Sequence, residues 1–311
     1  MLETTYGYKT HLVTLKAGDQ TIAAIPVSVV RSTLTGSRAI SMPFFDLCPP
    51  IAKTADLAKS LFNELLSFAE KQKLDYVEAR GWSNESTCGT PSLSFYNHTV
   101  PLSEGPESIF NRFSSSNRRA IRKAQKEGVD VGISTGIEAV KDFYRLQCIT
   151  RRRHGLPPQP FTFFKNLHRE ILSEGKGVVV YARVENQTVS SSIYMEQGDT
   201  VHYKYGASDL AYQNARCNNI VMWKALEHFS QKGLRVMDFG RNSPKGQEGL
   251  RRYKLGYGAE EKTVHYHRYS LKKQAVVPMS DDIYGWHNVV FANLPAPLGR
   301  LAGKLIYKHI A

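Results

Sequence analysis

Residues Val201–Glu261 read VHYKYGASDLAYQNARCNNIVMWKALEHFSQKGLRVMDFGRNSPKGQEGLRRYKLGYGAEE. Aromatic and polar residues alternate over Val201–Ala207, which predicts a strand. Apolar residues recur at helical spacing over Ile220–Lys232, and Gly233 then ends the predicted helix. The short apolar run Leu234–Phe239 predicts a second strand. A strand, a helix and a strand in this order form a βαβ unit, in which the two strands run parallel.

The composition is that of a folded, basic protein. The chain has 311 residues, 41% of them hydrophobic, and a formal net charge of +13. This length supports one large or two smaller domains. The charge favours phosphate-bearing partners, such as nucleic acid, an anionic membrane or a nucleotide-linked substrate, without choosing among them. Four cysteines without CxxC spacing indicate reduced structural thiols. With no signal-peptide pattern in Met1–Lys16 and no apolar run of membrane-spanning length, we expect a cytoplasmic protein.

A weak internal repeat relates the two halves of the chain. Phe68–Gly81 matches Phe229–Gly240 if one residue is skipped, so that Glu78 falls opposite Asp238. A hairpin, a third strand, an irregular loop and a helix precede each segment. The pattern predicts a mixed α/β (α+β) fold built from two copies of one unit, with chance similarity as the alternative. The expected segments are a first unit (1–105), a basic and proline-containing helical connection (106–175), a second unit with the catalytic loop (176–275), and a C-terminal tail with an amphipathic helix (276–311).

Several short motifs occur together in a specific order. They are Ser41–Cys48, Asn117–Ala124, Arg152–Gly155, Asp238–Gly240, Arg252–Lys254 and Gly256–Ala259. In this combination the chain resembles the Fem-type (FemAB-related) aminoacyl- and N-acyltransferases, and among them the members associated with exopolysaccharide export and PEP-CTERM systems. The resemblance spans residues 20–265 and implies two tandem GNAT-like (acyl-CoA N-acyltransferase-like) units with mixed central sheets. Family members carry a further helix and strand before the first hairpin, so the first unit is either trimmed here or begins inside a longer protein.

The resemblance implies acyl transfer to an amine of a cell-envelope peptidoglycan or polysaccharide precursor. The donor is either aminoacyl-tRNA or acyl-CoA, with no permanently bound cofactor and no metal. Attack by an amine builds negative charge on the carbonyl oxygen, and a fixed cation stabilises that charge by ~2.7–4 kcal/mol. Lys254, in the glycine- and arginine-rich predicted loop Gly240–Gly258, matches the family's lysine and is the candidate for this role. A solvated loop lysine is the alternative. Asp238 either accepts the amine's proton, pairs with Arg241, or caps backbone N–H groups of the loop.

Basic, aromatic and polar residues are the candidates for binding the two substrates. For the acceptor they are Phe44, Asp46, Arg152, Arg153, Tyr203, Tyr205, Arg241 and Arg252. For the donor they are Arg118, Arg119, Arg122, Lys123, Gln213 and Arg216. Tyr203 and Tyr205 alternate along the predicted strand, so we expect them to share one face. The segment Tyr212–Asn219 lacks the glycine-rich loop that holds the pyrophosphate of coenzyme A in GNAT-like folds, which favours tRNA, although Gln213 and Arg216 could still contact phosphate.

The basic residues Arg118–Lys126 lie in a predicted single helix, Glu107–Lys126, and suit the phosphate backbone of tRNA. The stretch Asn293–Ile310 has leucines at helical spacing and basic residues at Arg300, Lys304 and Lys308. Such a helix either lies on an anionic membrane surface, at the inner face of the membrane, or packs on its own domain.

Two alternatives to an acyltransferase belong to a different functional class. They are a non-catalytic nucleic-acid-binding protein and a membrane-associated structural protein. The lack of aromatic residues in Arg118–Lys126 counts against the first. His265 and His267 alternate on a predicted strand without a third ligand nearby, which indicates exposed strand histidines rather than a metal site.

Overall fold

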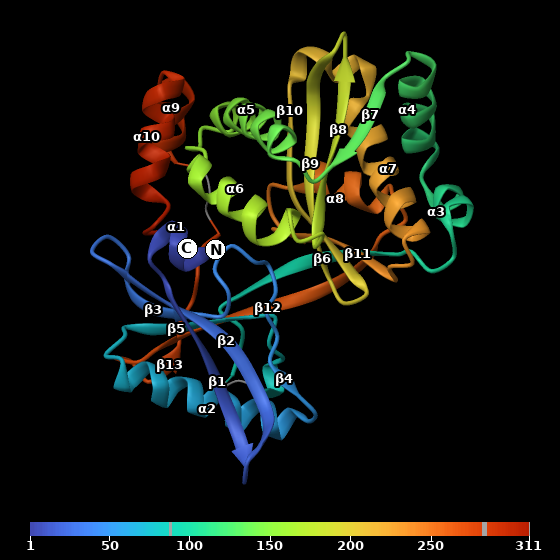
Figure 1. Ribbon diagram of the computed structural model, residues 1–311. Coiled ribbons are helices and arrows are strands. Elements are labelled where there is room, and N and C mark those ends of the chain that lie inside the picture. Colours follow the sequence, from blue (N-terminus) through green and yellow to red (C-terminus); the bar gives the residue numbers. More distant parts are fainter. Residues whose placement is uncertain (87–88, 282–284, 311) are drawn as a thin grey trace. The chain divides into compact units, whose positions relative to one another are not determined.

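The computed structural model describes residues 1–86, 89–281 and 285–310 (Figure 1). The chain forms two compact units, and each is described by itself. The first unit is assembled from Leu2–Tyr96, Thr263–Ile283 and Leu305–Ala311, and the second from Asn97–Lys262 and Tyr284–Lys304. The strands β6 (Leu93–Pro101) and β12 (Glu260–Ser270) contribute residues to both units. Each unit combines a mixed sheet with covering helices, which confirms the predicted α/β class.

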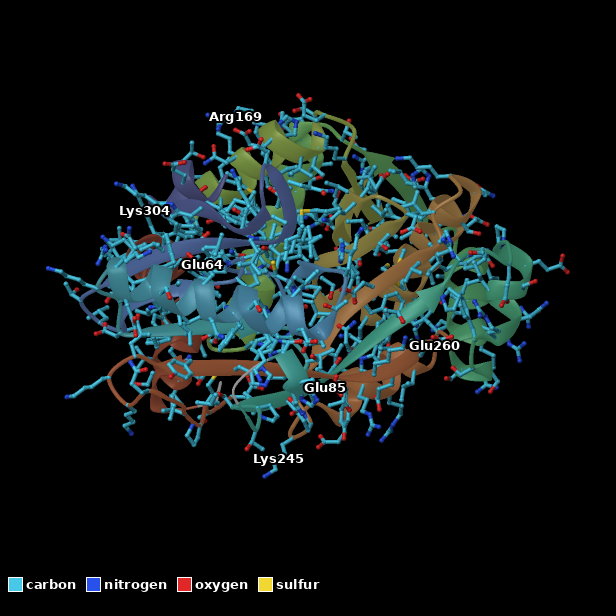
Figure 2. All side chains as sticks on the ribbon, turned by 90° about the horizontal axis from the view of Figure 1, so that it is seen from below. Glu64, Glu85, Arg169, Lys245, Glu260 and Lys304 are labelled. Carbon is cyan, nitrogen blue, oxygen red and sulfur yellow. The ribbon has the colours of Figure 1, made fainter. Side chains whose placement is uncertain are left out.

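The first unit is a mixed sheet covered by one long helix. Its strands follow the order β1 (Lys9–Ala17), β2 (Gln20–Ser32), β3 (Gly36–Ile40), β5 (Tyr76–Arg80) and β12. The β1–β2 and β2–β3 pairs are antiparallel, and the β3–β5 pair is parallel. The helix α2 (Ala55–Lys71) buries Leu61 and Leu65 in the core, because its apolar residues recur at helical spacing. Its opposite side, which carries Glu64, is exposed (Figure 2). The short elements are α1 (Leu2–Tyr6), β4 (Ile51–Ala52), η1 (Asn84–Ser86) and β13 (Ala275–Val276).

The second unit has helices on both faces of its sheet. The strands follow the order β7 (Asp130–Ser134), β8 (Gly177–Val184), β9 (Gln187–Gln197), β10 (Thr200–Ser208), β11 (Val236–Asn242) and β6. Helices α4 (Ser115–Lys126) and α7 (Cys217–Gln231) lie on one face, and α5 (Ile137–Arg153) and α6 (Phe161–Leu167) on the other (Figure 1). The remaining elements are α3 (Pro106–Arg112), η2 (His168–Leu172), η3 (Leu210–Ala215), α8 (Glu248–Leu255), α9 (Trp286–Asn293) and α10 (Ala296–Ile306).

The internal repeat is real. In each unit a hairpin leads to a third antiparallel strand, then to a helix, and then to a strand parallel to the third. The parallel pairing ends at Ile40 opposite Glu78 in the first unit, and at His202 opposite Asp238 in the second. Glu78 and Asp238 therefore occupy equivalent positions, as the sequence match predicts.

The structure also corrects how the two copies align. Each repeat helix ends with a leucine N–H bound to the carbonyl five residues earlier, from Leu74 to Ala69 and from Leu234 to Phe229. The residue before each leucine has positive φ, 54° at Lys73 and 87° at Gly233. No residue needs to be skipped, because Ala69 rather than Phe68 is the counterpart of Phe229. A lysine thus occupies, in the first copy, the left-handed position that glycine normally takes at a helix end.

Three predicted elements need correction. The predicted helix Glu107–Lys126 is two helices, because Phe113 is extended and Ser114 caps α4 by accepting a hydrogen bond from the Asn117 N–H at 3.3 Å. The predicted loop Gly240–Gly258 contains the end of β11 and the whole of α8. The amphipathic helix predicted within Asn293–Ile310 is α10, and it is shorter than that stretch, because extended backbone at Leu294 precedes it and the helix ends at Ile306.

Candidate functional site

The candidate site of the second unit lies where two parallel strands separate. β10 and β11 pair from Thr200 to His202 and from Val236 to Asp238. Beyond this point β10 continues along β9 to Ser208, whereas β11 continues to Asn242 beside β6. The first residues past the paired segment, Tyr203 and Phe239, pack in the core formed with α7.

A bulge in β10 overturns the prediction that Tyr203 and Tyr205 share one face. Tyr203 pairs with Tyr194, but Tyr205 pairs with Ile193, the adjacent residue of β9. Because successive strand residues point to opposite faces, the extra residue Lys204 sends the two tyrosines to opposite sides of the sheet. Tyr203 packs in the core formed with α7, and its hydroxyl occupies the space where a Cβ at Gly206 would lie.

Tyr205 packs on the other side of the sheet against aromatic residues of α5 and α6. Its ring centroid is 5.5 Å from that of Phe164 and 6.0 Å from that of Phe163. The alternation of residue types in the sequence does not predict that Tyr203 and Tyr205 lie on opposite faces. A bulge changes the strand pairing but leaves that alternation unchanged.

Asp238 is a buried carboxylate held by hydrogen bonds. Its Oδ1 accepts hydrogen bonds from Asn97 Nδ2 at 3.1 Å and from the Gly240 N–H at 2.8 Å, and its Oδ2 lies 3.3 Å from His202 Nδ1. Burial alone raises the pKa of Asp238, but the hydrogen bonds from His202 and Gly240 outweigh it and leave the pKa below its usual value. Gly240 has φ 73°, which lets its N–H turn back toward the carboxylate.

Lys254 lies on α8 rather than in a loop, and only 4% of it is exposed. Its Nζ donates hydrogen bonds to the carbonyl oxygens of Gly240 at 2.8 Å and Arg241 at 3.2 Å. The alternative of a solvated loop lysine is therefore wrong. The ammonium group instead lies at the part of β11 that continues past its pairing with β10.

Three further polar residues, which the sequence analysis did not identify as site residues, accompany Lys254. His98 Nε2 donates to Glu261 Oε2 at 2.9 Å, and Arg251 binds both oxygens of Glu261 at 2.6 and 2.7 Å. Burial, and then the positive charge of Lys254, lower the pKa of His98. The hydrogen bonds from Arg251 lower the pKa of Glu261. A neutral imidazole, a carboxylate and two cations thus lie together beside β11.

A cavity of about 240 Å³ opens at the N-terminus of α7. Gln213, Arg216 and Asn218 line it, together with Tyr253 of α8. Asn218 is held in place, because its Oδ1 accepts from Ser190 Oγ at 2.7 Å and its Nδ2 donates to Ser208 Oγ at 3.2 Å. Unpaired backbone N–H groups and the helix dipole make such a terminus favourable for an anion. The two predicted donor residues Gln213 and Arg216 therefore share one cavity.

Arg216 has an unusual backbone. It has φ 58° and ψ 30°, the left-handed conformation, directly before α7. This conformation costs a residue with a side chain of order 1 kcal/mol and is most often occupied by glycine. The chain thus places an arginine at the turn where glycine would be favoured.

The basic residues of α4 are mostly exposed. Arg119, Arg122 and Lys123 are open to solvent, whereas Arg118 is half-buried and donates to the Asn111 carbonyl at 3.4 Å. The guanidinium carbon of Arg122 lies 5.9 Å from the centre of the Phe110 ring. The apolar side of α4, including Ile121, is buried in the core with α7.

The predicted acceptor residues occupy several different environments. Phe44 belongs to the first unit, where its ring lies 5.2 Å from that of Tyr6. The Asp46 carbonyl, in the same unit, accepts a hydrogen bond from the Tyr266 hydroxyl. In the second unit, the exposed Arg152 donates to the Ala292 carbonyl at 3.1 Å. The others are the exposed residues Arg153 and Arg252 and the half-buried Arg241.

The histidines of β12 are not exposed as predicted. His267 is buried, with Nε2 3.2 Å from Asn84 Oδ1, and burial lowers its pKa to about 4. Across the described residues, no group of three or more His, Cys, Asp or Glu side chains could hold a metal ion. Cys48, Cys148 and Cys217 are free thiols, and Cys88 lies outside the described residues. In the part of the chain that the structure describes, no helix is long and apolar enough to cross a bilayer.

The separated strands, the repeat and the anion-favouring helix terminus define an acyltransferase of the GNAT type. The family model for the acetyltransferase (GNAT) domain matches residues 111–266, half of the chain, and the chain belongs to this family. The structure is similar to the crystal structure of FemX, with a TM-score of 0.68 and 13% identity over 87% of this chain and 90% of that one. It is also similar to L-PGS from Bacillus licheniformis, with a TM-score of 0.56 and 10% identity over 95% of this chain and 88% of that one. None of the curated proteins matches.

Proposed function

We propose that the protein transfers an acyl or aminoacyl group from an activated donor to an amine of a cell-envelope peptidoglycan or polysaccharide precursor. The amine nitrogen bonds to the carbonyl carbon, the bond to the donor's leaving oxygen or sulfur breaks, and the amine's proton leaves with that atom. The observation that carries the proposal is the cavity at the α7 N-terminus, beside strands that separate. The resemblance of the sequence motifs to those of Fem-type, exopolysaccharide-associated members supports the envelope assignment, and the similarity to FemX supports the fold.

In this proposal Lys254 stabilises the charge that develops on the carbonyl oxygen. It is a cation in a nearly water-free position, where such stabilisation is strongest. Its hydrogen bonds to Gly240 and Arg241 fix the ammonium group before the donor arrives. Asp238, whose pKa is low, is a weak base at neutral pH and serves chiefly to orient His202 and the turn at Gly240.

The donor is either aminoacyl-tRNA or acyl-CoA. Arg216 and Gln213 would contact a phosphate of either donor, whereas the exposed basic side of α4 fits a tRNA backbone in particular. Tyr203, Arg241 and Arg252 remain candidates for the acceptor in the second unit, and Phe44 and Asp46 in the first.

The test is single-turnover transfer with each donor. Acetyl-CoA and a charged tRNA are mixed separately with a lysine-containing peptidoglycan precursor or an amino sugar, and mass spectrometry detects the acyl group on the amine. We expect product with one donor class. A correctly folded protein that transfers from neither donor to either acceptor would refute the proposal.

A peripheral membrane contact is favoured by a specific observation. Leu298, Leu301 and Leu305 of α10 are 51%, 53% and 57% exposed, far more than leucines of a packed helix. Arg300 and Lys304 accompany them on the same helix, and Lys304 is labelled in Figure 2. We propose that α10 lies on an anionic membrane surface, near which an envelope precursor would be modified.

A further inference from the structure

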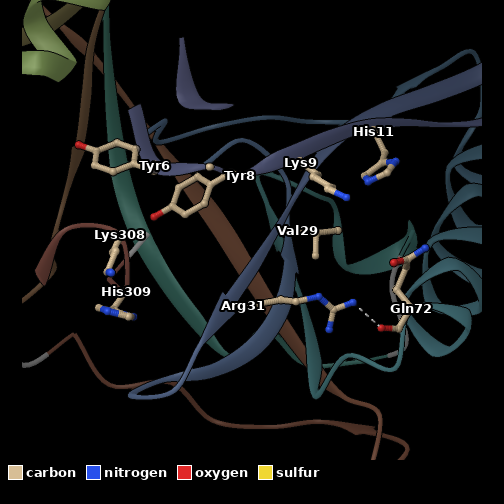
Figure 3. A pocket seen from close by; sticks show the side chains of 10 residues that line it. Tyr6, Tyr8, Lys9, His11, Val29, Arg31, Gln72, Lys308 and His309 are labelled. Carbon is tan, nitrogen blue, oxygen red and sulfur yellow. Dashed lines mark hydrogen bonds between the residues drawn. The ribbon is translucent and has the colours of Figure 1, made fainter. Parts of the chain in front are cut away.

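The first unit contains a cavity of about 360 Å³ that is separate from the site described above. The basic residues that line it are Lys9, His11, Arg31, Lys308 and His309 (Figure 3). No carboxylate is among the described residues that line it. Its volume falls in the range of ordinary small-molecule sites. An unneutralised group of cations in a concave site attracts an anion.

Two neighbouring strands supply three of these side chains. Lys9 of β1 pairs with Val29 of β2, and His11 and Arg31 lie two residues further along their strands. Since every second strand residue points to the same face, all four side chains project from one face of the hairpin. Val29 on this face also joins the core that α2 covers.

The helix α2 ends at this cavity. Gln72, its C-terminal capping residue, lines the cavity, and Arg31 donates to the Gln72 carbonyl at 2.8 Å. The carbonyl oxygens at a helix C-terminus would repel an anion. Arg31 binds one of these carbonyl oxygens, that of Gln72. This hydrogen bond also fixes the orientation of the remaining N–H groups of the Arg31 guanidinium.

The C-terminal segment forms the other wall and is anchored on both sides of Lys308. The Tyr8 hydroxyl donates to the Tyr307 carbonyl at 3.2 Å. The His309 carbonyl accepts hydrogen bonds from Thr35 Oγ1 at 2.6 Å and from an Arg38 amino group at 2.9 Å. Lys308 is thus carried by fixed backbone, although its own side chain is exposed.

The hydrogen bonds around Ser32 determine which nitrogen of His309 is a donor. Ser32 Oγ accepts the N–H groups of Leu34 at 3.1 Å and Thr35 at 3.0 Å, which uses both of its lone pairs. Its hydroxyl hydrogen is therefore donated to His309 Nδ1, 3.0 Å away. A neutral His309 then carries its own hydrogen on Nε2, where it can donate to a ligand.

We propose that this cavity binds a phosphate or diphosphate group. Arg31 offers a planar pair of donors, Lys9 and Lys308 offer compact charges, and His309 adds a neutral donor, which is the combination that phosphate oxygens accept. The phosphate belongs either to a soluble ligand or to a lipid headgroup. This inference does not depend on the proposed transfer reaction, because none of its residues lies in the second unit.

The first experiment is calorimetric titration of the full chain with inorganic pyrophosphate at low salt. We expect binding, and we expect Lys9→Gln combined with Arg31→Gln to weaken it at least ~10-fold, since charge-assisted contacts are the strong ones. Lys16→Gln is the matched control, because Lys16 is an exposed lysine on the same strand β1 and lies outside the cavity. This control should bind pyrophosphate as the unmodified chain does. Urea unfolding of each variant checks that the fold is retained.

The second experiment identifies the source of the phosphate. Vesicles containing phosphatidic acid are floated with the unmodified chain and with the Lys9→Gln/Arg31→Gln variant, with and without pyrophosphate. Loss of flotation in the variant, and release of the unmodified chain by pyrophosphate, would assign the cavity to a lipid headgroup. Flotation that is equal in both proteins, together with pyrophosphate binding that the variant loses, would assign it to a soluble phosphate. If neither pyrophosphate nor vesicle binding depends on Lys9 and Arg31, the proposal is wrong.

Discussion

The Nζ atom of Lys254 donates a hydrogen bond to the carbonyl oxygen of Gly240, 2.8 Å away, and so ties α8 to the end of β11. Lys254 therefore holds α8 against β11 and is also the candidate for stabilising the oxyanion of the reaction. The two roles differ in what they predict for stability and for rate, and substitutions at Lys254 can separate them.

We expect Lys254→Met to reduce the single-turnover rate by ~10²–10³-fold, because the cation aimed at the developing charge is lost. We also expect a loss of about 1–3 kcal/mol in the free energy of unfolding, since the buried Gly240 carbonyl and the partly buried Arg241 carbonyl lose their donor. Methionine keeps the unbranched stem, so packing changes little. Lys254→Arg should restore most of the stability but only part of the rate, because its planar group cannot place a compact charge at the same point.

Quench-flow measurements at saturating donor and acceptor, together with urea unfolding, give both quantities for each variant. An unchanged single-turnover rate in Lys254→Met, whatever its stability, would remove Lys254 from the mechanism.

The stability lost on Asp238→Asn should depend on pH in a defined direction, because the substitution removes a titrating carboxylate. The folded-state pKa of Asp238 lies below its ordinary value of 3.8, so the carboxylate stabilises the fold above that pH. This contribution disappears as the pH falls through the folded-state pKa. We therefore expect the variant to be less stable by about 1–3 kcal/mol at neutral pH, with a difference that narrows in acid.

Urea unfolding of both proteins at pH values from neutral to about 3 measures this difference. Asp199→Asn is the control, because the contacts of the Asp199 carboxylate with Arg235 and with the Thr200 hydroxyl are exposed, and exposed pairs contribute little. A stability difference for Asp238→Asn that stays constant with pH would show that its charge does not stabilise the fold.

The local pattern of the sequence predicts the fold well, because the apolar periodicity of each helix and strand is set by burial on one side. The hairpin, the third strand, the helix and the parallel strand of each unit follow from that pattern, as does the equivalence of Glu78 and Asp238. The bulge at Lys204 does not, since it changes the pairing partner of Tyr205 without changing the alternation itself. It is set by packing against α5 and α6.

The candidate site is predicted only where its residues are close in the chain. Gln213 and Arg216 meet in one cavity because they precede the same helix. The contact of His98 with Glu261 joins residues 163 positions apart, and no local signal reveals it. Local sequence predicts the basic cavity of the first unit even less, because Tyr8 and Tyr307 are 299 positions apart. They meet only through the tertiary fold.

Arg216→Gly should stabilise the fold and weaken donor binding at once. Glycine relieves the left-handed backbone, which we expect to raise the free energy of unfolding by about 0.5–1 kcal/mol. The same change removes the guanidinium from the cavity at the α7 N-terminus, so the donor's Kd should rise about 10-fold.

Lys73→Gly is the matched control, because Lys73 also has a left-handed backbone, at φ 54°, but lies in the first unit. It should gain stability to the same extent and bind donor normally. Donor binding that is equal in the two variants would exclude Arg216 as a donor contact.

Arg119→Gln combined with Arg122→Gln should distinguish the two donors. If the donor is a charged tRNA, its affinity should fall, and the slope of log Kd against log salt should decrease by about 2, since each lost phosphate contact removes about one ion. The rate at saturating donor should not change. Lys59→Gln on the exposed side of α2 is the charge control. Unaltered salt dependence of tRNA binding would contradict a role for α4.

Leu298→Ser combined with Leu301→Ser should reduce flotation with anionic vesicles at least ~10-fold. The free energy of unfolding should stay within about 0.5 kcal/mol of that of the unmodified protein, because both side chains are half exposed. Flotation assays and urea unfolding give the two results. Leu61→Ser, a buried leucine of α2, is the contrasting variant and should unfold readily. Destabilisation of the α10 variant comparable to that of Leu61→Ser would favour packing over membrane contact.

The equivalent acids of the two units have acquired different partners. Glu78 is enclosed by two arginines, with Arg80 at 2.6 Å and Arg268 at 2.9 Å, so its surroundings carry permanent charge. Asp238 instead faces Asn97 and His202, and neither carries a permanent charge as the arginines do. In a chain made of two copies of one unit, the acid at the shared position can be structural in one copy. In the other copy its partners remain free to change. Selection for a new substrate could then act on the second copy while the first preserves the fold.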